Sequence, residues 1–472
     1  MSTLADRIRG VLQGTPGPSR PGAATPIRPP EALAADPQAE ASHQPSAVGH
    51  QLSPVGSGFS GTAAANSLES VLGGQWRQFG DALCFVVESR HERTSPHGST
   101  TVGALGDVLR EAADGVPLLA GFPLGAPFSF FDLETTGLSA GAGTYAFLVG
   151  CASFDEDGRF VTRQFMLVRL ADERALLTSL ADEWSRAGAL VSFNGKSFDA
   201  PLVETRCLYH RLAWTGGALP HLDMLHVARR LWKRGDEVAG GAALPAAWES
   251  GCSLGALERQ LLGHRRHGDV PGFEIPQRYF HFVRTGDPRP LAPVFEHNRL
   301  DLLSLAALTA RAAQLARTGP TGARDAREAL ALGWMYARAG LEPRAREAYE
   351  RAVELSARLP ALHVESLRML AMLLRRARQY DEAARYWRRI LEVRVCPRHI
   401  AREASDALAI HHEHRLRDLV SARKFALGSL ERSGRPARDE AIRHRLNRID
   451  RKLERLQSEP SILQFAEPWS MT

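Results

Sequence analysis

Apolar positions are sparse at the start of the chain and become periodic further along. Residues 1–66 are rich in Pro, Ala, Gly and Ser and show little apolar periodicity. Such a segment cannot bury enough apolar surface to offset the entropy lost on ordering, so we predict a disordered arm. Residues 67–126 form a lead-in segment, where the pattern predicts a strand near 82–88 and a helix near 102–113.

From residue 127 onward, short apolar runs alternate with amphipathic stretches. The short runs predict five strands, near 127–133, 145–154, 160–168, 189–193 and 220–224. The amphipathic stretches predict helices near 172–187, 197–211, 225–234, 253–262 and 290–317. Three consecutive strands followed by helix–strand alternation predict an α/β domain over 127–318, in which helices flank a mixed five-stranded sheet.

After a Gly- and Pro-containing break at 318–322, the remaining pattern is helical over 324–457. Apolar residues there recur at tetratricopeptide spacing, in a frame that repeats after 38 residues and again, more weakly, after 38 more. The three sets are Leu332, Gly333, Tyr336, Ala345, Tyr349 and Ala352; Leu370, Ala371, Leu374, Ala383 and Trp387; and Leu408, Ala409, His412 and Phe425. We predict an all-α domain of tetratricopeptide-like repeats, followed by a tail over 458–472.

Composition narrows the class of protein. The chain has no apolar run of about 18 residues that would cross a membrane, and its N-terminus lacks the apolar core of a signal peptide. Its five cysteines are scattered and form no Cys-x-x-Cys pair, so we predict neither a disulfide framework nor a zinc site. We expect a soluble, cytoplasmic protein with no membrane partner.

The net charge of +6 is unevenly spread. Residues 321–456 hold 30 Lys and Arg against 19 Asp and Glu, so this part carries +11 and the rest carries −5. A basic region attracts polyanions such as nucleic acid. However, only four of the 59 basic residues are Lys, so richness in Arg is also a property of the whole chain.

Two carboxylates stand at the end of the first strand of the α/β domain. Asp132 and Glu134 are two residues apart, so they project from the same face of the strand. Side-by-side carboxylates repel each other unless a cation lies between them, and hard divalent ions prefer oxygen ligands. The pair therefore suggests a metal site for phosphoryl transfer at the edge of a sheet.

Two further acidic positions complete a candidate set of four. Asp199 follows a short strand and a Gly turn, at the start of a helix; the structural alternative is that it only complements the helix dipole. His297 and Asp301 are four residues apart and share a helix face; the alternative is an ordinary His–Asp pair. The basic run at 264–267 indicates a solvated turn, with nucleic-acid contact as its alternative.

The order of these motifs resembles the DEDD, or DnaQ-like, 3′–5′ exonuclease superfamily with its ribonuclease-H-like fold, and looks closest to the YprB-like branch. The strings that carry the resemblance are Asp132-Leu133-Glu134-Thr135-Thr136-Gly137-Leu138, Phe193-Asn194-Gly195-Lys196-Ser197-Phe198-Asp199, His221-Leu222-Asp223, Asp269-Val270-Pro271-Gly272 and His297-Asn298-Arg299 with Asp301. The resemblance implies that Asp132, Glu134, Asp199 and Asp301 hold two Mg²⁺ or Mn²⁺ ions.

The resemblance also implies a base next to the attacking water. In one branch of the superfamily this base is a tyrosine, and in another it is a histidine one residue further from the last acid. Here three residues separate His297 from Asp301, so a histidine stands at the tyrosine-type spacing. Histidine can accept a proton near neutral pH, and we assign His297 as the base. Thr135, Gly137 and Leu138 would hold the terminal nucleotide, with Asn194 and Lys196 close to a phosphate.

We therefore predict a metal-dependent 3′–5′ exonuclease that hydrolyses single-stranded DNA or RNA, with helical repeats that bind a protein or peptide partner or extend the nucleic-acid track. The alternative is a catalytically weak or inactive nucleic-acid-binding scaffold, favoured by the unusual spacing of His297. A third interpretation is a phosphatase or nucleotide hydrolase that uses the same metals.

Overall fold

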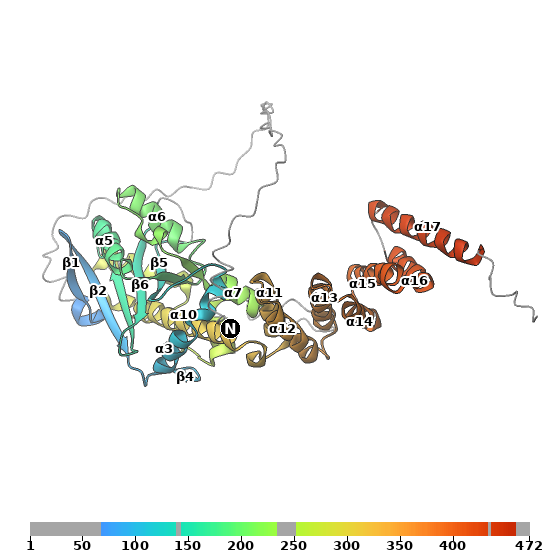
Figure 1. Ribbon diagram of the computed structural model, residues 1–472. Coiled ribbons are helices and arrows are strands. Elements are labelled where there is room, and N and C mark those ends of the chain that lie inside the picture. Colours follow the sequence, from blue (N-terminus) through green and yellow to red (C-terminus); the bar gives the residue numbers. More distant parts are fainter. Residues whose placement is uncertain (1–67, 138–142, 234–251, 433–435, 459–472) are drawn as a thin grey trace, which may run out of the picture.

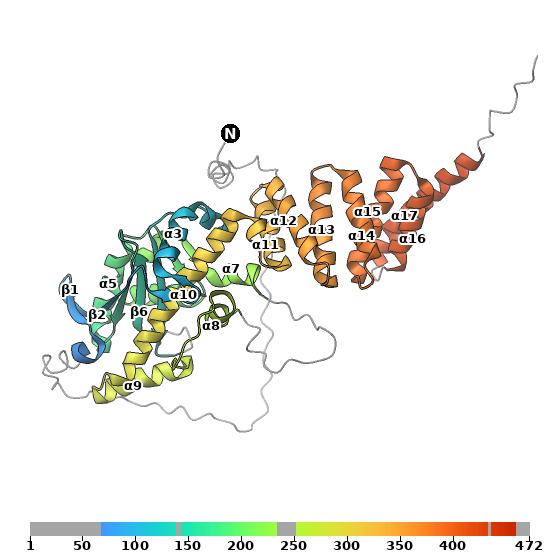
Figure 2. The same cartoon turned by 90° about the horizontal axis from the view of Figure 1, so that it is seen from below.

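The computed structural model describes residues 68–137, 143–233, 252–432 and 436–458 (Figure 1). The predicted arm over 1–66 and nearly all of the predicted tail lie outside these residues. A mixed sheet with helices on both sides forms one region, and a row of helices extends away from it as the second (Figure 2). Among the described helices, none combines the length and apolar content that crossing a membrane requires.

The main sheet has seven strands, not the predicted five. They run in the order β1, β2, β7, β6, β5, β8 and β9, with β5, β8 and β9 parallel to each other and the remaining neighbours antiparallel. Their bounds are β1 Gln75–Phe79, β2 Ala82–His91, β5 Phe128–Thr135, β6 Ala146–Phe154, β7 Phe160–Met166, β8 Ala189–Ser192 and β9 His221–Asp223. Two further short strands, β3 Pro96–His97 and β4 Thr100–Thr101, pair with each other.

The extra strands come from the predicted lead-in segment. Strand β2 pairs with β7 from Phe85 opposite Met166 to His91 opposite Phe160, and β1 then covers the outer edge of β2. The strand near 82–88 was predicted, but its partner lies about seventy residues further along the chain, and an apolar pattern carries no signal of pairing over such a separation. The five predicted strands of the α/β domain are confirmed.

Apolar residues of β5 alternate between two cores, one on each face of the sheet. Phe128 and Phe130 pack with the core formed by α3, α4, α7 and most of α10. Phe131 and Leu133 pack with the core formed by α5, α6 and α9. The helices are α3 Val102–Glu111, α4 Val116–Ala120, α5 Glu173–Trp184, α6 Asp199–Tyr209, α7 Met224–Leu231, α8 Leu254–Leu257, α9 Ile275–Thr285 and α10 Ala292–Thr318.

Helix α9 was not predicted, although its sequence carries a signal. Ile275, Tyr279 and Phe282 are its buried residues, and their spacing of four and three residues places them on one helical face. Pro276 stands in the first turn, where its missing amide hydrogen costs nothing. The ring of Tyr279 stacks on Phe147, and its hydroxyl donates to the carbonyl of Leu167, at 3.0 Å.

The second region consists of helical pairs. Helices α11 Ala326–Arg338 and α12 Glu342–Leu355, α13 Pro360–Arg376 and α14 Tyr380–Glu392, and α15 Arg398–His411 and α16 Leu419–Glu431 pack in sequence, and α17 Pro436–Ser458 packs on α16. Gly333 of α11 lies against Tyr349 of α12, where an added Cβ would approach the ring to 2.4 Å. The repeating helical pairs are as predicted, while their assignment as tetratricopeptide-like repeats stays a prediction.

A buried carboxylate joins the two regions. Glu328 on α11 is fully buried and accepts a hydrogen bond from Nε1 of Trp232, which ends α7, at 2.9 Å. Arg311 of α10 approaches the same carboxylate to 3.4 Å, and the backbone amide of Arg324 donates to it at 2.7 Å. The break at 318–322 is accordingly a short, packed turn, because contacts on both sides of it fix its ends.

Candidate active site

The structure places Asp132 and Glu134 on β5, opposite Gly150 and Leu148 of β6. Both side chains meet groups on α10, since Asp132 contacts Asn298 and Glu134 lies 4.0 Å from Nε2 of His297. The two carboxylates thus share the face expected from their spacing. The register of β5 and β6 shifts directly after Glu134, so the regular strand pairing is interrupted at the second acid.

Asn298 is a site residue that the sequence analysis did not single out. It is fully buried, and its Nδ2 donates to Oδ2 of Asp132 at 3.0 Å. Its Oδ1 in turn accepts from Nε2 of Gln164 on β7, at 3.0 Å. Gly150 makes this approach possible, because an added Cβ there would lie 2.1 Å from Oδ1 of Asn298. The chain Gln164–Asn298–Asp132 fixes the orientation of the first acid.

His297 and Asp301 lie on the same face of α10, as their spacing predicts. Nε2 of His297 is 3.5 Å from Oδ2 of Asp301. On its other side, the imidazole Nδ1 is 2.6 Å from Oδ1 of Asp269. An ionised carboxylate only accepts hydrogen bonds, so this contact places the proton on Nδ1 and leaves Nε2 directed at Glu134 and Asp301. Burial raises the pKa of Asp269, but the hydrogen bond to His297 and the charge of Arg266 outweigh it and hold that pKa below its usual range.

Arg266 is a second residue that the sequence analysis missed. Its guanidinium contacts Asp301 and Glu258, and its Nη1 lies 3.3 Å from Asp269. Glu258 belongs to a π-helical turn, Glu258–Leu262, and only 2% of its side chain is exposed. The predicted solvated turn at 264–267 is therefore wrong for Arg266, whose side chain is 9% exposed. A charge run along a loop gives no sign that one member points inward to buried acids.

Asp199 is the first residue of α6 and follows a tight turn at 194–198. Asp223, which ends β9, accepts from the backbone amides of Asn194 at 2.8 Å and Lys196 at 3.1 Å. Asn194 has a positive φ of 70°, a conformation that asparagine tolerates. Gly195 leaves room for the acid, since an added Cβ would lie 3.0 Å from Oδ2 of Asp199. Asp223 therefore has a structural role here: it holds the turn that presents Asp199.

The predicted substrate residues lie around these acids in different ways. Thr135 directs its hydroxyl to the carbonyl of Gly137, at 2.8 Å, and so shapes the end of β5. Lys196 is exposed, with Nζ 5.1 Å from the centre of the Phe122 ring. Asn194 is fixed by its backbone bond to Asp223. Leu138 lies outside the described residues.

The carboxylates of this site raise each other's pKa. Burial, then the charges of Asp301, Glu134 and Asp199, raise the pKa of Asp132 well above its usual range, despite the bond from Asn298. The pKa of Glu134 is raised well above its usual range by burial and by the charges of Asp301, Asp199 and Asp269. Burial and the charge of Asp223 raise the pKa of Asp199 to about 7. For Asp301, burial raises the pKa more than Arg266 and His297 lower it.

These acids form an electrostatic unit that Arg266 compensates only in part, through its contact with Asp301. Within the described residues, no three His, Cys, Asp or Glu side chains converge closely enough to hold a metal ion in their present orientations. Asp132 is bonded to Asn298 instead, and Asp301 to Arg266. The donor set still fits a hard divalent cation, because buried carboxylates with raised pKa values are stabilised by a nearby positive charge and are the ligands that Mg²⁺ and Mn²⁺ prefer.

Comparison with known proteins agrees with this architecture. A model of the RNase_H superfamily matches residues 129–313, which include all four acids and His297. A domain of this superfamily indicates a nuclease that acts on nucleic acid with divalent metal ions. The chain is also 31% identical over 375 residues to the uncharacterized protein YprB of Bacillus subtilis (strain 168), an alignment that spans 75% of this chain and 84% of that protein. The chain therefore belongs to the YprB family and contains an RNase_H-superfamily domain.

Proposed function

We propose that this protein is a metal-dependent 3′–5′ exonuclease of the DEDD type, which hydrolyses phosphodiester bonds of single-stranded DNA or RNA. The observation that carries the proposal is the group of Asp132, Glu134, Asp199 and Asp301, in which Glu134 is buried and the other three are half-buried, and whose pKa values are all raised. Keeping four such acids together is costly for a fold. The cost is understandable if the site exists to bind cations.

The four acids would hold two Mg²⁺ or Mn²⁺ ions. Bound ions of this kind activate a water molecule and stabilise the charge that develops on the phosphate and the leaving oxygen. Asn298 would keep Asp132 in one orientation through its bond to Oδ2. Asp301 would release Arg266 and bind a metal ion, so one positive partner would replace another.

His297 would act as the general base. Its Nδ1 is tied to Asp269, and its Nε2 is directed toward Glu134 and Asp301. A base held in one tautomer by a carboxylate is oriented for proton transfer. Asp269 thus has the role of a positioning residue. Thr135, Gly137 and Leu138 would hold the terminal nucleotide, and Asn194 and Lys196 would lie at the next phosphate.

A second candidate function is a nucleic-acid-binding scaffold with weak or no catalysis, which uses its repeats for partner binding. The contact of Arg266 with Asp301 and Glu258 favours this alternative. In such a protein the guanidinium would supply permanently the positive charge that a metal supplies in an enzyme. The two functions differ in whether Arg266 gives way when metal and substrate are present.

A degradation assay tests the proposal. The full-length protein is incubated with 5′-labelled single-stranded DNA and RNA in the presence of Mg²⁺, Mn²⁺ or EDTA. We expect metal-dependent shortening from the 3′ end that yields nucleoside 5′-monophosphates. The absence of cleavage of either polymer with any metal would reject the enzyme and favour the scaffold. Cleavage of mononucleotides alone would indicate a nucleotide hydrolase.

A further inference from the structure

The helical repeats carry a row of hollows on one surface. The largest, of about 890 Å³, lies between α13, α15 and the end of α16. A second, of about 480 Å³, shares Arg375, Ala407 and Ile410 with it. A third, of about 320 Å³, lies over α11 and α13 and includes Glu365, which bonds to Arg368 of the first. We call these three neighbouring hollows together the basic groove.

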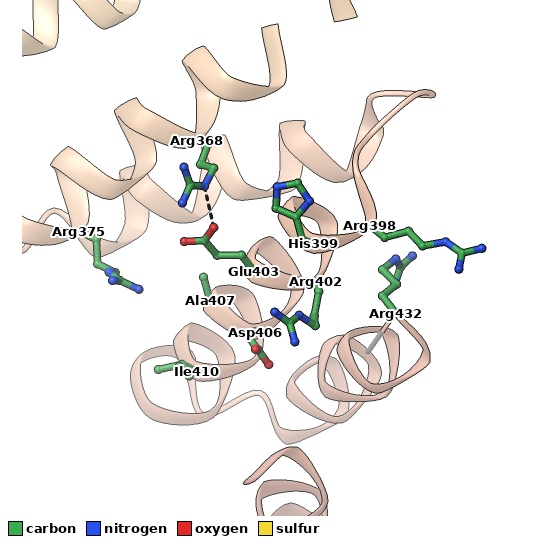
Figure 3. Close-up of a pocket in the computed structure, with 10 residues that line it drawn as sticks. All are labelled: Arg368, Arg375, Arg398, His399, Arg402, Glu403, Asp406, Ala407, Ile410 and Arg432. Carbon is green, nitrogen blue, oxygen red and sulfur yellow. Dashed lines mark hydrogen bonds and ion pairs between the residues drawn. The ribbon is translucent and has the colours of Figure 1, made fainter. Parts of the chain in front are cut away.

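Arginines dominate the central hollow of the basic groove. Five of them project from three helices around it: Arg368, Arg375, Arg398, Arg402 and Arg432 (Figure 3). Only two acids, Glu403 and Asp406, line the same hollow. Arginine presents a planar fork of donors that matches the oxygens of a phosphate.

The two acids compensate the arginines of this hollow only in part. Glu403 accepts from Nε of Arg368 at 2.7 Å, the contact drawn in Figure 3. Asp406 accepts from the hydroxyl of Ser429 at 2.8 Å. Arg375, Arg398 and Arg402 have no acidic partner within the described residues. With five arginines and two acids, the lining of this hollow carries a net charge of 5 − 2 = +3.

Two aromatic rings, the exposed Trp334 and the half-buried Tyr380, line the outer hollows of the basic groove. Trp334, in the third hollow, is 41% exposed and has the guanidinium of Arg338 5.6 Å from its ring centre. Tyr380, in the second hollow, has the guanidinium of Arg415 4.1 Å from its ring centre. Proteins that bind single strands combine a positive groove with aromatic side chains on which bases stack. An acidic peptide would use the arginines but would have no need of the rings.

The basic groove also reaches the α/β domain. The third hollow is lined by Arg230 of α7 and by Lys233, which lies two residues beyond its end, as well as by Arg327 and Trp334 of α11. Helix α7 begins directly after Asp223, the residue that holds the turn in front of Asp199. Positive charge thus extends from the repeats onto the helix that starts beside the candidate active site.

We propose that the basic groove binds the backbone of single-stranded nucleic acid, with Trp334 and Tyr380 as stacking platforms for bases, and leads the strand to the acids on the sheet. The bound strand is taken to be the substrate of the nuclease domain, and in this respect the inference rests on the proposed function. Binding to the groove itself requires no metal and no cleavage.

The test compares two triple variants of the full-length protein. The groove variant is Arg375→Ala, Arg398→Ala and Arg402→Ala. The matched control is Arg358→Ala, Arg385→Ala and Arg394→Ala, three exposed arginines of the same repeats that line none of these hollows. Both variants lose three positive charges. Circular dichroism melting confirms that both are folded.

Binding to fluorescent single-stranded DNA and RNA is measured by anisotropy in EDTA, over a series of salt concentrations, with oligonucleotides of about 20 nucleotides. We expect the groove variant to bind at least about tenfold more weakly, with the slope of log K against log salt reduced by about two. The control should change less than about twofold. Equal loss in both variants would overturn the groove as a site, since net charge alone would then explain it.

A polyglutamate peptide of equal charge is titrated in parallel. Binding as tight as that of the oligonucleotides would overturn the proposal and indicate an acidic protein partner. Cleavage of oligonucleotides too short to reach the repeats is measured separately with Mn²⁺. If the groove variant binds the long oligonucleotides as tightly as the wild type and the wild type still cleaves the short ones, only the groove is rejected. Groove-dependent binding without any cleavage rejects only the proposed nuclease.

Discussion

The two regions of this molecule handle charge in opposite ways. The sheet gathers buried and half-buried carboxylates into one group, where burial and neighbouring acids raise the pKa values of Asp132 and Glu134, with Arg266 and His297 as partial compensation. The helical repeats gather arginines on an open surface, where the few acids are already paired. Neither arrangement favours stability in isolation, because like charges repel.

The comparison shows that the degree of burial determines which kind of ligand each region is suited to bind. Buried acids pay a desolvation cost that a small divalent ion can offset, and salt screens such an interaction little. Exposed arginines are well solvated and gain most from a flexible polyanion that releases counterions, so their binding depends steeply on salt. One region is suited to chemistry on a phosphodiester, and the other is suited to holding a strand.

The largest expected effect comes from removing the acids on β5. The double variant Asp132→Asn, Glu134→Gln should lose cleavage by about 10³-fold or more, because it removes two proposed ligands of the metal ions that would stabilise the developing charge. The fold should persist, since neutral side chains relieve the repulsion. The matched variant Glu156→Gln, Asp157→Asn, in an exposed turn, should cleave at the wild-type rate. Retained cleavage in the first variant would show that the acids are not the catalytic centre.

Arg266 provides the next test, because it links the two kinds of charge. The variant Arg266→Gln leaves buried Glu258 without its partner, which should lower the free energy of unfolding by about 3 kcal/mol. The double variant Glu258→Gln, Arg266→Gln should recover most of this loss in urea denaturation. If Arg266 competes with metal for Asp301, the double variant should also bind Mn²⁺ more tightly. Unchanged Mn²⁺ affinity would show that Arg266 does not compete with the metal for Asp301.

The base assignment predicts a smaller loss. His297→Ala should lower the cleavage rate by about 10²-fold, the usual contribution of a general base. Asp269→Asn should shift the pH–rate profile with a smaller loss, because it perturbs the tautomer of His297 and not the proton acceptor itself. His226→Ala, an exposed histidine on α7, serves as the control. An unchanged pH profile in both His297 and Asp269 variants would exclude this base.

The pH dependence of stability should have opposite signs in the two regions. The pKa of Asp199 is about 7 in the folded protein against about 3.9 unfolded, so the folded state binds the extra proton. The free energy of unfolding of the metal-free protein should therefore rise by on the order of 3 kcal/mol as the pH falls from 7 to 4. Asp199→Asn should flatten this part of the curve in denaturant titrations.

In the repeats, hydrogen bonds from Arg448 and Lys452 outweigh burial and lower the pKa of Glu413 to about 2. Its contribution to stability should be complete above pH 4.5 and should be lost as the pH falls toward 2. Melting of α17, which carries both partners, should follow this loss. The account would be contradicted if Asp199 and Glu413 changed the free energy of unfolding in the same direction as the pH falls.

The sequence predicts those parts of the site that depend on local pattern. Asp132 and Glu134 could be placed because a strand alternates its side chains, and His297 and Asp301 because a helix brings residues four apart together. The sequence could not place three other residues of the site, Asn298, Gln164 and Arg266. Their roles depend on which strand α10 crosses and on where a loop folds back. Gly150, where α10 approaches the sheet, shows the same limit: its need for a small side chain exists only in three dimensions.

The fold shows the same division. The five central strands follow from apolar runs, whereas the addition of β1 and β2 depends on the free edge of β7. The spacing of Ile275, Tyr279 and Phe282 is a local signal for helix α9, so this helix, unlike the pairing of β2 with β7, can be predicted from the sequence. The helical pairs were predicted from their repeating frame, but the groove that they form depends on which helices lie side by side.

The most direct test of the central claim is whether the acid group binds divalent ions. Mn²⁺ binding to the full-length protein can be followed by electron paramagnetic resonance, with and without a nucleoside 5′-monophosphate. We predict that the wild type binds Mn²⁺, more tightly with the nucleotide, and that Asp132→Asn abolishes the binding. Absence of bound Mn²⁺ under both conditions, or equal binding by Asp132→Asn, would contradict the account.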